Sequence, residues 1–244
     1  MASSSWHRFF LCCSESNVTT AFSAMPLHSL EPVDERTLLG LWHLTEPAEE
    51  LWQALPQPAP YQELLPAGRD AGRAQQWLAG RALAHRLLAE FSLAPSMVLL
   101  NDANGRPFFP ERPELAVSLS HSGEWVAALL STRGRVGTDV EQVRPKAQQL
   151  APRFLSEAER ADAGDDVVKH SLYWSAKETL YKLHSRRALV FKEHIQLDPF
   201  GLREAGVLTG HLLAENFRSQ HQIQYQRLSS AYVLTYTLDA SPLP

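Results

Sequence analysis

One stretch, Arg135-Val-Gly-Thr-Asp-Val-Glu-Gln142, constrains what this chain can fold into more than any other. Its β-branched and apolar residues predict a strand, in which alternate side chains face the same side. Asp139 and Glu141 therefore share one face, where two carboxylates repel each other. A hard divalent cation such as Mg²⁺, which prefers carboxylate oxygens, would relieve that repulsion. For an isolated Asp-x-Glu pair, a solvated polar face at a strand end is the simpler interpretation.

The composition is that of an ordinary globular protein, because 44% of the 244 residues are hydrophobic and 20% are charged. This length accommodates one large domain or two small ones. A net charge of −4 argues against a protein that binds nucleic acid. The adjacent Cys12 and Cys13 provide no disulfide framework, so we expect a cytoplasmic protein. No apolar run reaches the roughly 18–20 residues of a membrane span, and we expect residues 1–24 to be a disordered extension.

Before the Asp-x-Glu stretch, the pattern predicts a helix framed by short strands. Residues 38–44 indicate a buried strand, and the apolar spacing of residues 75–91 indicates a helix. The Asn-Gly pair within residues 101–107 marks a turn. Residues 115–122 and 125–130 then read as two consecutive strands, which favours an antiparallel sheet.

After that stretch, Ser156 and Glu159 form a capping box that opens a helix, and residues 165–183 predict a longer helix. Glu178 and Lys182 are one helical turn apart in the long helix. Such a pair is commonly a surface ion pair worth ~0.3 kcal/mol, but Trp174 on the same line favours a face held against the protein. Four apolar segments indicate further strands, at residues 195–197, 207–213, 223–228 and 232–238.

Three basic residues have two open interpretations each. Arg73 and Arg81 lie along the helix at residues 75–91, or just before it, either as arginines extending to solvent or as a docking site for phosphate. His121 stands at the end of a predicted strand, where a histidine is either an ordinary surface residue or part of a site.

Four blocks, taken in their order and spacing, resemble the 4′-phosphopantetheinyl transferase superfamily, in its surfactin-synthetase-activating branch. The blocks are Gly105-Arg106-Pro107, Ser118-Leu-Ser-His-Ser-Gly123 with Trp125-Val126, Val136-Gly-Thr-Asp-Val-Glu141, and Trp174-Ser-Ala-Lys-Glu-Thr-Leu-Tyr-Lys182. The resemblance runs from about Trp77 to Lys182. It implies an α+β monomer of two similar, pseudo-symmetric subdomains with antiparallel sheets and the active site in the cleft between them. We expect these subdomains near residues 37–136 and 137–240.

The resemblance also implies a reaction, in which the phosphopantetheine arm of coenzyme A passes to a serine of an apo carrier protein and 3′,5′-ADP leaves. Phosphoryl transfer of this kind needs positioning, charge neutralisation and a base. By resemblance, Asp139, Glu141 and Glu178 would hold Mg²⁺. Glu178, or a water on the metal beside it, is the candidate base. Lys182 would meet the α-phosphate.

The remaining contacts to coenzyme A follow from the same resemblance. His121, with Ser120, would meet its phosphates. Arg106 stands where the family commonly has lysine, and either cation suits a phosphate. The basic cluster that compact members carry near their N-terminus has no clean match here. Arg81, and after it Arg73, are therefore the candidates for the 3′-phosphate.

The partner implied is an acyl, polyketide or peptidyl carrier protein, and the sequence does not distinguish among them. Carrier proteins are usually acidic, so a local basic and apolar surface is expected to dock them. The candidates are Arg186, Arg187, Leu189, Val190 and Phe191, with an ordinary basic loop as the alternative.

Two other functions fit part of the pattern. A Mg²⁺-dependent nuclease also uses acids and a lysine, but it typically has the acid and lysine two residues apart on a strand. Glu178 and Lys182 are four apart on a predicted helix. An inactive carrier-binding homologue is the other alternative, and the presence of all three acids with Lys182 and His121 disfavours it.

Overall fold

The computed structural model describes residues 27–66, 71–94, 96–184, 189–214 and 217–240. The predicted extension at residues 1–24 lies outside this part of the chain, as do Arg186 and Arg187 of the predicted docking surface. Within the described ranges, no helix combines the length and the apolar character that crossing a membrane requires.

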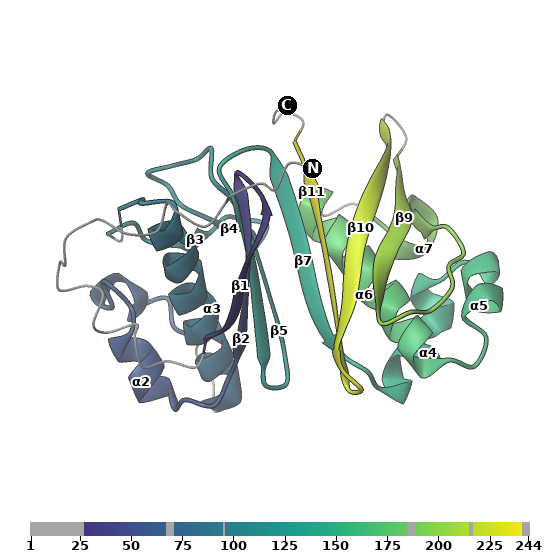
Figure 1. Cartoon of the computed structure of the whole chain (residues 1–244), viewed down its shortest axis with the longest axis horizontal. Coiled ribbons are helices and arrows are strands. Elements are labelled where there is room, and N and C mark those ends of the chain that lie inside the picture. Colours follow the sequence, from purple (N-terminus) through teal and green to yellow (C-terminus); the bar gives the residue numbers. More distant parts are fainter. Residues whose placement is uncertain (1–26, 67–70, 95, 185–188, 215–216, 241–244) are drawn as a thin grey trace, which may run out of the picture.

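The first lobe is a four-stranded antiparallel sheet covered on one face by helices (Figure 1). Its elements are β1 (Leu27–Asp34), β2 (Thr37–His43), α2 (Ala48–Gln53), a 3-10 turn (Ala59–Tyr61), α3 (Ala71–Glu90), β3 (Leu100–Asn101), β4 (Pro107–Phe108), β5 (Ala116–Ser122) and β6 (Trp125–Ser131). The strand order is β1-β2-β6-β5, and β3 and β4 form a separate small hairpin. Helix α3 packs on β2 and β6, which places the lobe's main apolar core between helix and sheet.

The second lobe is a five-stranded antiparallel sheet with its own helical layer. Its elements are β7 (Arg135–Gln142), α4 (Pro145–Phe154), α5 (Glu157–Ala163), α6 (Val167–His184), α7 (Phe191–His194), β8 (Ile195–Leu197), β9 (Ala205–Ala214), β10 (Phe217–Ser229) and β11 (Tyr232–Asp239). The strand order is β7-β11-β10-β9-β8. Helix α6 packs along β7 and β11, and the predicted capping box at Ser156 and Glu159 opens α5.

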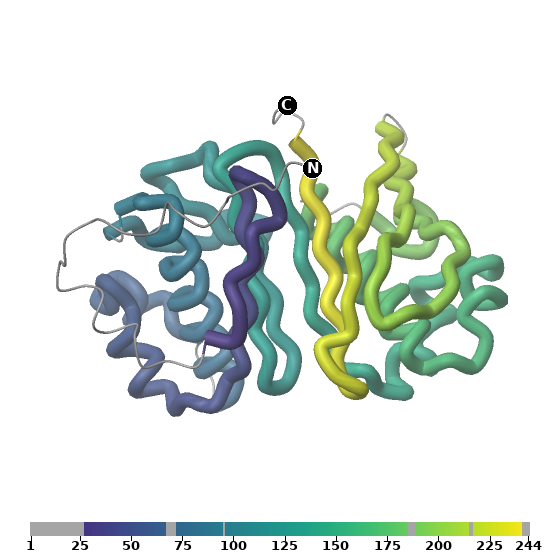
Figure 2. Tube along the Cα trace, viewed as in Figure 1, coloured from purple at the N-terminus to yellow at the C-terminus, as the bar shows by residue number. Residues whose placement is uncertain are grey.

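The strands β2, β6 and β7 are buried on both faces over most of their length, which explains their near-continuous apolar runs. In β2, Trp42 joins the core beneath α3, while Leu39 and Leu41 face the other way. These two leucines join a second apolar core with Val140 of β7 and Leu234 of β11. The layers therefore run helix, sheet, sheet, helix, and the trace passes from the first lobe to the second between β6 and β7 (Figure 2).

The two sheets also meet along a seam between β5 and β7. Each of these described strands is an edge of its own sheet, and no backbone ladder joins the two. Serine hydroxyls bridge them instead. The Oγ of Ser118 accepts from the N–H of Thr138 at 3.1 Å, and the Oγ of Ser122 accepts from the N–H of Gln142 at 3.1 Å. Because residues 118 and 122 meet 138 and 142, the two strands run in the same direction along the seam.

The structure confirms the predicted α+β class and the two-lobed arrangement of antiparallel sheets. The edge strand β1 was not predicted. Its Leu27-His-Ser-Leu-Glu-Pro-Val-Asp34 sequence has an irregular burial pattern and a proline, as is typical of an edge strand. The first sheet therefore begins before residue 37, the expected start of the first subdomain.

Candidate active site

Helix α6 reaches the Asp-x-Glu strand because β7 carries a glycine where the two elements cross. A Cβ on Gly137 would lie 2.1 Å from the carbonyl oxygen of Thr179, so any larger residue would push the helix away. The Ser175 hydroxyl donates to the Asp139 carbonyl at 3.3 Å and fixes the same contact. This close packing holds Glu178 and Lys182 beside Asp139.

Asp139 lies at the centre of the site and is only 4% exposed. Its Oδ1 atom accepts from the Ser120 hydroxyl at 2.8 Å and from the Lys182 Nζ at 2.8 Å. Lys182 also donates to the carbonyl of Thr138 at 3.0 Å. Among the described residues, no group donates to the buried Oδ2 atom of Asp139. A buried carboxylate oxygen without a donor is costly, and it therefore marks a place for a bound cation or donor.

Glu141 and Glu178 complete an acidic face around Asp139. Burial, and next the charge of Asp139, raises the pKa of Glu141 to about 7. The same two causes raise the pKa of Glu178 to about 7, and the charge of Lys182 opposes both shifts. The three carboxylates therefore sense one another although Glu178 comes from a different element.

Cationic and imidazole groups lie on the other side of Asp139. His121 projects at the end of β5, and its pKa is lowered first by burial and then by the charges of Lys182 and Arg73. Arg73, near the start of α3, is therefore close to His121, and its side chain is exposed. At neutral pH the imidazole is uncharged and can donate or accept a hydrogen bond.

A pocket of about 160 Å³ opens between the lobes on this side of the seam. Arg106, Gly105 and Pro107 of the β3–β4 hairpin form one wall, and Tyr181 and Lys182 of α6 form the other. Burial lowers the pKa of Arg106, although its guanidinium stays charged at neutral pH. The pocket thus places one cation from each lobe opposite the other.

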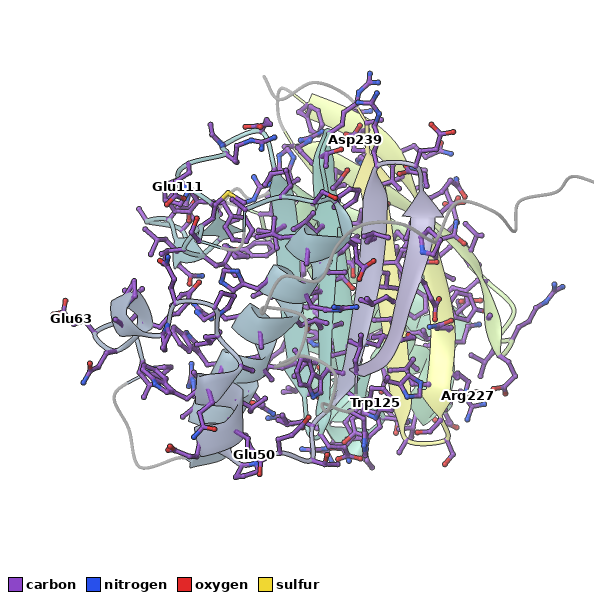
Figure 3. All side chains as sticks on the ribbon, turned by 60° about the vertical axis from the view of Figure 1, so that its left-hand side comes forward. Glu50, Glu63, Glu111, Trp125, Arg227 and Asp239 are labelled. Atoms are coloured by element: carbon purple, nitrogen blue, oxygen red, sulfur yellow. The ribbon has the colours of Figure 1, made fainter. Side chains whose placement is uncertain are left out.

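The direction of the seam can be followed in Figure 3. Asp239, the β11 partner of Arg135, lies near one end of the strands, and Trp125, the β6 partner of Ser122, lies near the other (Figure 3). Glu141 lies on β7 toward the Trp125 end of this line, and Arg135 lies at the opposite end.

The structure does not bring Arg81 to the surface of this pocket. Its side chain is only 4% exposed, and its guanidinium carbon lies 3.3 Å from the centroid of the Trp77 ring. It donates to Asn101 Oδ1 at 2.8 Å. Burial lowers the pKa of Arg81 to about 10. The expectation of a phosphate ligand rested on the position of Arg81 along the helix and on the resemblance of its Leu-Ala-Gly-Arg block to family members, and neither reveals a partner twenty residues further along the chain.

Sequence reasoning left Lys177 and Tyr181 without roles. Lys177 is fully buried and pairs with Glu159 at 2.8 Å. A lysine on the buried side of a helix, downstream of a capping-box glutamate, is the signal that would have found this pair. Tyr181 lines both the pocket and a neighbouring groove on α6, and nothing in the apolar periodicity distinguishes it from a core residue.

The donor set suits a hard divalent cation, but the side chains do not yet converge on one. In the described part of the chain, no three acidic, histidine or cysteine side chains are grouped closely enough to hold a metal ion. Lys182 occupies one oxygen of Asp139, and the other oxygen has no donor. The oxygen of Asp139 without a donor could bind Mg²⁺, and the cation would relieve the repulsion among Asp139, Glu141 and Glu178.

The site thus combines the carboxylates of β7 and α6 with a pocket between the two lobes that Arg106 and Lys182 line. Comparison with family models identifies the family. Residues 64–131 match the 4′-phosphopantetheinyl transferase N-terminal domain, and residues 135–237 match the 4′-phosphopantetheinyl transferase superfamily. The chain belongs to this superfamily, of the Sfp-like type, as the sequence blocks predicted.

Several curated relatives carry the same family name. The 4′-phosphopantetheinyl transferase AcpT of Escherichia coli (strain K12) is 35% identical over 136 residues, which cover 53% of this chain and 66% of AcpT. The 4′-phosphopantetheinyl transferase Sfp of Bacillus subtilis (strain 168) is 30% identical over 104 residues, 41% of this chain and 44% of Sfp. The psf-1 protein of Bacillus pumilus is 30% identical over 117 residues, 45% of this chain and 50% of psf-1. The chain thus aligns with 66% or less of the length of these relatives.

Proposed function

We propose that this protein transfers the 4′-phosphopantetheine arm of coenzyme A to a serine of an apo carrier protein, with Mg²⁺, and releases 3′,5′-ADP. One observation carries the proposal: the buried Asp139 carboxylate, with one oxygen free of donors, lies between acidic neighbours and the cations of a pocket formed by both lobes. Membership of the superfamily supports it.

Lys182 and Arg106 would bind the phosphates of coenzyme A. The two cations face the same pocket from opposite lobes, so a pyrophosphate between them would be held by both. Arg73 would extend the positive potential beyond the pocket, and the uncharged His121 imidazole beside it could form a hydrogen bond to a phosphate oxygen. The Ser120 hydroxyl, which donates to Asp139, fixes the carboxylate in this position.

Glu178 is the proposed general base. Glu178 adjoins the groove proposed below as the docking site, and without metal its pKa is raised to about 7 by burial and by the charge of Asp139. It would accept the proton of the carrier serine as the serine oxygen forms a bond to the pantetheine phosphate. The bond from that phosphorus to the bridging oxygen breaks, and the electron pair leaves with 3′,5′-ADP. Lys182 would stabilise the charge that develops on the leaving phosphate.

Asp139, Glu141 and Glu178 would hold Mg²⁺. When bound, the ion supplies charge neutralisation at the pyrophosphate. The three residues come from two elements, β7 and α6, which are packed together at Gly137. Burial and the charge of Asp139 raise the pKa values of Glu141 and Glu178, and a bound cation would oppose both effects.

An apolar groove with a basic rim is the proposed docking site for an acidic carrier protein. The groove has a volume of about 580 Å³, adjoins Glu178, and includes Leu189 and Phe191, two of the predicted docking residues. Val190 beside them is 47% exposed. The other walls of the groove are Leu150, Phe154, Trp174 and Tyr181. The basic side chains near the groove are Arg144, Lys146 and Arg153. Charge complementarity would steer the carrier, and the aromatic walls would hold it.

Incubation with coenzyme A, Mg²⁺ and an apo carrier protein tests the proposal directly. Intact-mass spectrometry should show the carrier gaining one phosphopantetheine, and 3′,5′-ADP should accumulate in equal amount. The variant Asp139→Ala should give no product, while Asp198→Ala, at an exposed position on the second lobe, should match the wild type. Absence of product with carriers of the fatty acid, polyketide and peptide types would refute the transferase activity and leave a carrier-binding homologue.

A further inference from the structure

Arg81 is a buried cation whose contacts lead to the wall of the pocket. Its guanidinium lies over the face of Trp77 and also donates to the Trp77 carbonyl at 3.3 Å. Helix α3 therefore fixes the position of the side chain from two directions. The terminal Nη2 atom extends beyond the helix and meets Asn101 Oδ1 at 2.8 Å.

Asn101 passes this contact on to the turn of the β3–β4 hairpin. Because a guanidinium only donates, the amide of Asn101 must present its oxygen to Arg81 and its nitrogen to the other side. That nitrogen donates to the carbonyl of Gly105 at 2.7 Å. Gly105 has a φ of +82°, which favours glycine, so the turn is tight at this residue.

The same turn sets the backbone of Arg106. The carboxylate of Asp102 accepts from the N–H of Asn104 at 2.7 Å and from the N–H of Arg106 at 2.9 Å. Asn104, Gly105 and Arg106 all line the pocket between the lobes. A connected set of hydrogen bonds thus runs from the middle of α3 to the pocket wall that carries Arg106.

We propose that Arg81 is a positioning residue for this wall. It holds Asn101 in one amide orientation, Asn101 holds the Gly105 carbonyl, and the turn presents Arg106 to the pocket. Arg81 acts without touching the ligand. The expected role for coenzyme A binding rests on the proposed function, whereas the positioning of the turn does not.

The kinetic test uses the full chain with substitutions at the two links. Arg81→Met removes the cation at similar volume, and Asn101→Asp keeps an acceptor for Arg81 but loses the donor to Gly105. Each variant should raise the KM for coenzyme A about tenfold and change kcat less than about twofold. The KM of the double variant should be no higher than that of the more impaired single variant, because both substitutions break the same chain of contacts. Arg86→Met on the same helix, where the arginine pairs with Glu90 near the surface, should leave both constants unchanged.

Hydrogen exchange measured by mass spectrometry tests the positioning without any activity. Peptides that cover residues 100–108 should exchange faster in Arg81→Met and Asn101→Asp than in Arg86→Met or the wild type, with peptides from β10 unchanged. Equal exchange in all four proteins would overturn the proposal, and so would a fall in kcat with KM unchanged. A wild type that transfers nothing yet shows the expected exchange pattern would refute the proposed function and leave the positioning role standing. Asn101 is exposed, so this variant retains the test even where Arg81→Met folds poorly.

Discussion

Helix α6 carries two lysine–carboxylate pairs with opposite properties. Lys177 is fully buried, and its ammonium donates to Glu159 at 2.8 Å and to the carbonyls of Phe154 and Ile195 at 3.0 and 2.6 Å. Both oxygens of Glu159 are used, since Oε1 accepts from the N–H of Leu197 at 2.9 Å and Oε2 from that of Ser156 at 2.8 Å. This pair ties α4, α5, α6 and β8 together.

The Lys182–Asp139 pair, five residues further along the helix, is incompletely satisfied. The Lys182 side chain is 26% exposed, and one oxygen of the buried Asp139 has no donor among the described residues. Two further carboxylates with raised pKa values lie nearby. One helix thus carries a structural pair and a pair suited to function. The pair whose hydrogen-bonding groups are all used stabilises the fold, and the pair with an unused carboxylate oxygen leaves a place for a ligand.

The largest expected effect comes from breaking the satisfied pair. Lys177→Met leaves Glu159 buried without its cation, so the free energy of unfolding should fall by about 3–5 kcal/mol. Urea titration of the far-ultraviolet circular dichroism measures this change. A loss below about 1 kcal/mol would mean that Glu159 finds another cation or is protonated without cost.

Removing the lysine of the unsatisfied pair should act on the reaction more than on the fold. Lys182→Met should lower kcat for phosphopantetheine transfer by about 10²–10³-fold. Its unfolding free energy should fall by roughly 1–2 kcal/mol, because Lys182 is partly exposed and Ser120 still donates to Asp139. Steady-state kinetics with urea titration on the same preparation separates the two effects. A stability loss equal to that of Lys177→Met would erase the distinction between the pairs.

A substitution at the helix–strand crossing should disturb one pair and spare the other. In Gly137→Ala the new methyl would overlap the Thr179 carbonyl, so α6 must shift away from β7 at a cost of about 1–3 kcal/mol. Transfer activity should fall, because Lys182 and Glu178 move relative to Asp139. A tryptophan fluorescence spectrum unchanged from the wild type would show that Trp174, on α6 near the Lys177–Glu159 pair, has kept its surroundings. Full activity in this variant would contradict the close packing.

The last prediction is a pH dependence of stability that comes from Glu141 and Glu178, the two acids beside the unsatisfied pair. The pKa values of Glu141 and Glu178 rise from the usual 4.5 to about 7 in the folded protein. Between these values the folded state binds more protons than the unfolded state, so the unfolding free energy should fall as pH rises from 4.5 to 7. Denaturation across this range without divalent cation measures the slope. Mg²⁺ should flatten it, and so should the double variant with glutamine at both positions; a slope unaffected by either would assign it to other groups.

Much of the fold could be predicted because the central elements have strong local patterns. The strand at Trp125–Ser131 follows from a short continuous apolar run, and the long helix at Val167–His184 follows from apolar spacing. The strand β1 could not, since an edge strand needs no alternation and here contains Pro32. Its place depends on pairing with β2, which local sequence does not encode.

The site shows the same division. Strand alternation placed Asp139 and Glu141 on one side, and helical spacing placed Glu178 beside Lys182. Which oxygen of Asp139 has a donor depends on Ser120, a residue of the other lobe. The burial of Arg81 likewise depends on Asn101 and the ring of Trp77. Ser120 and Asn101 come from distant segments, so periodicity within β7 or α3 does not reveal these contacts.

The serine seam between β5 and β7 has a consequence for how the two lobes are spaced. In an ordinary sheet, the interval between neighbouring strands is set by main-chain geometry and is the same for every sequence. Here Ser118 and Ser122 set it with their hydroxyls. The distance between β5 and β7 therefore depends on individual side chains. Substitution of Ser118 or Ser122 is expected to change the spacing of the lobes, and with it the pocket that Ser118 lines, with both sheets left intact.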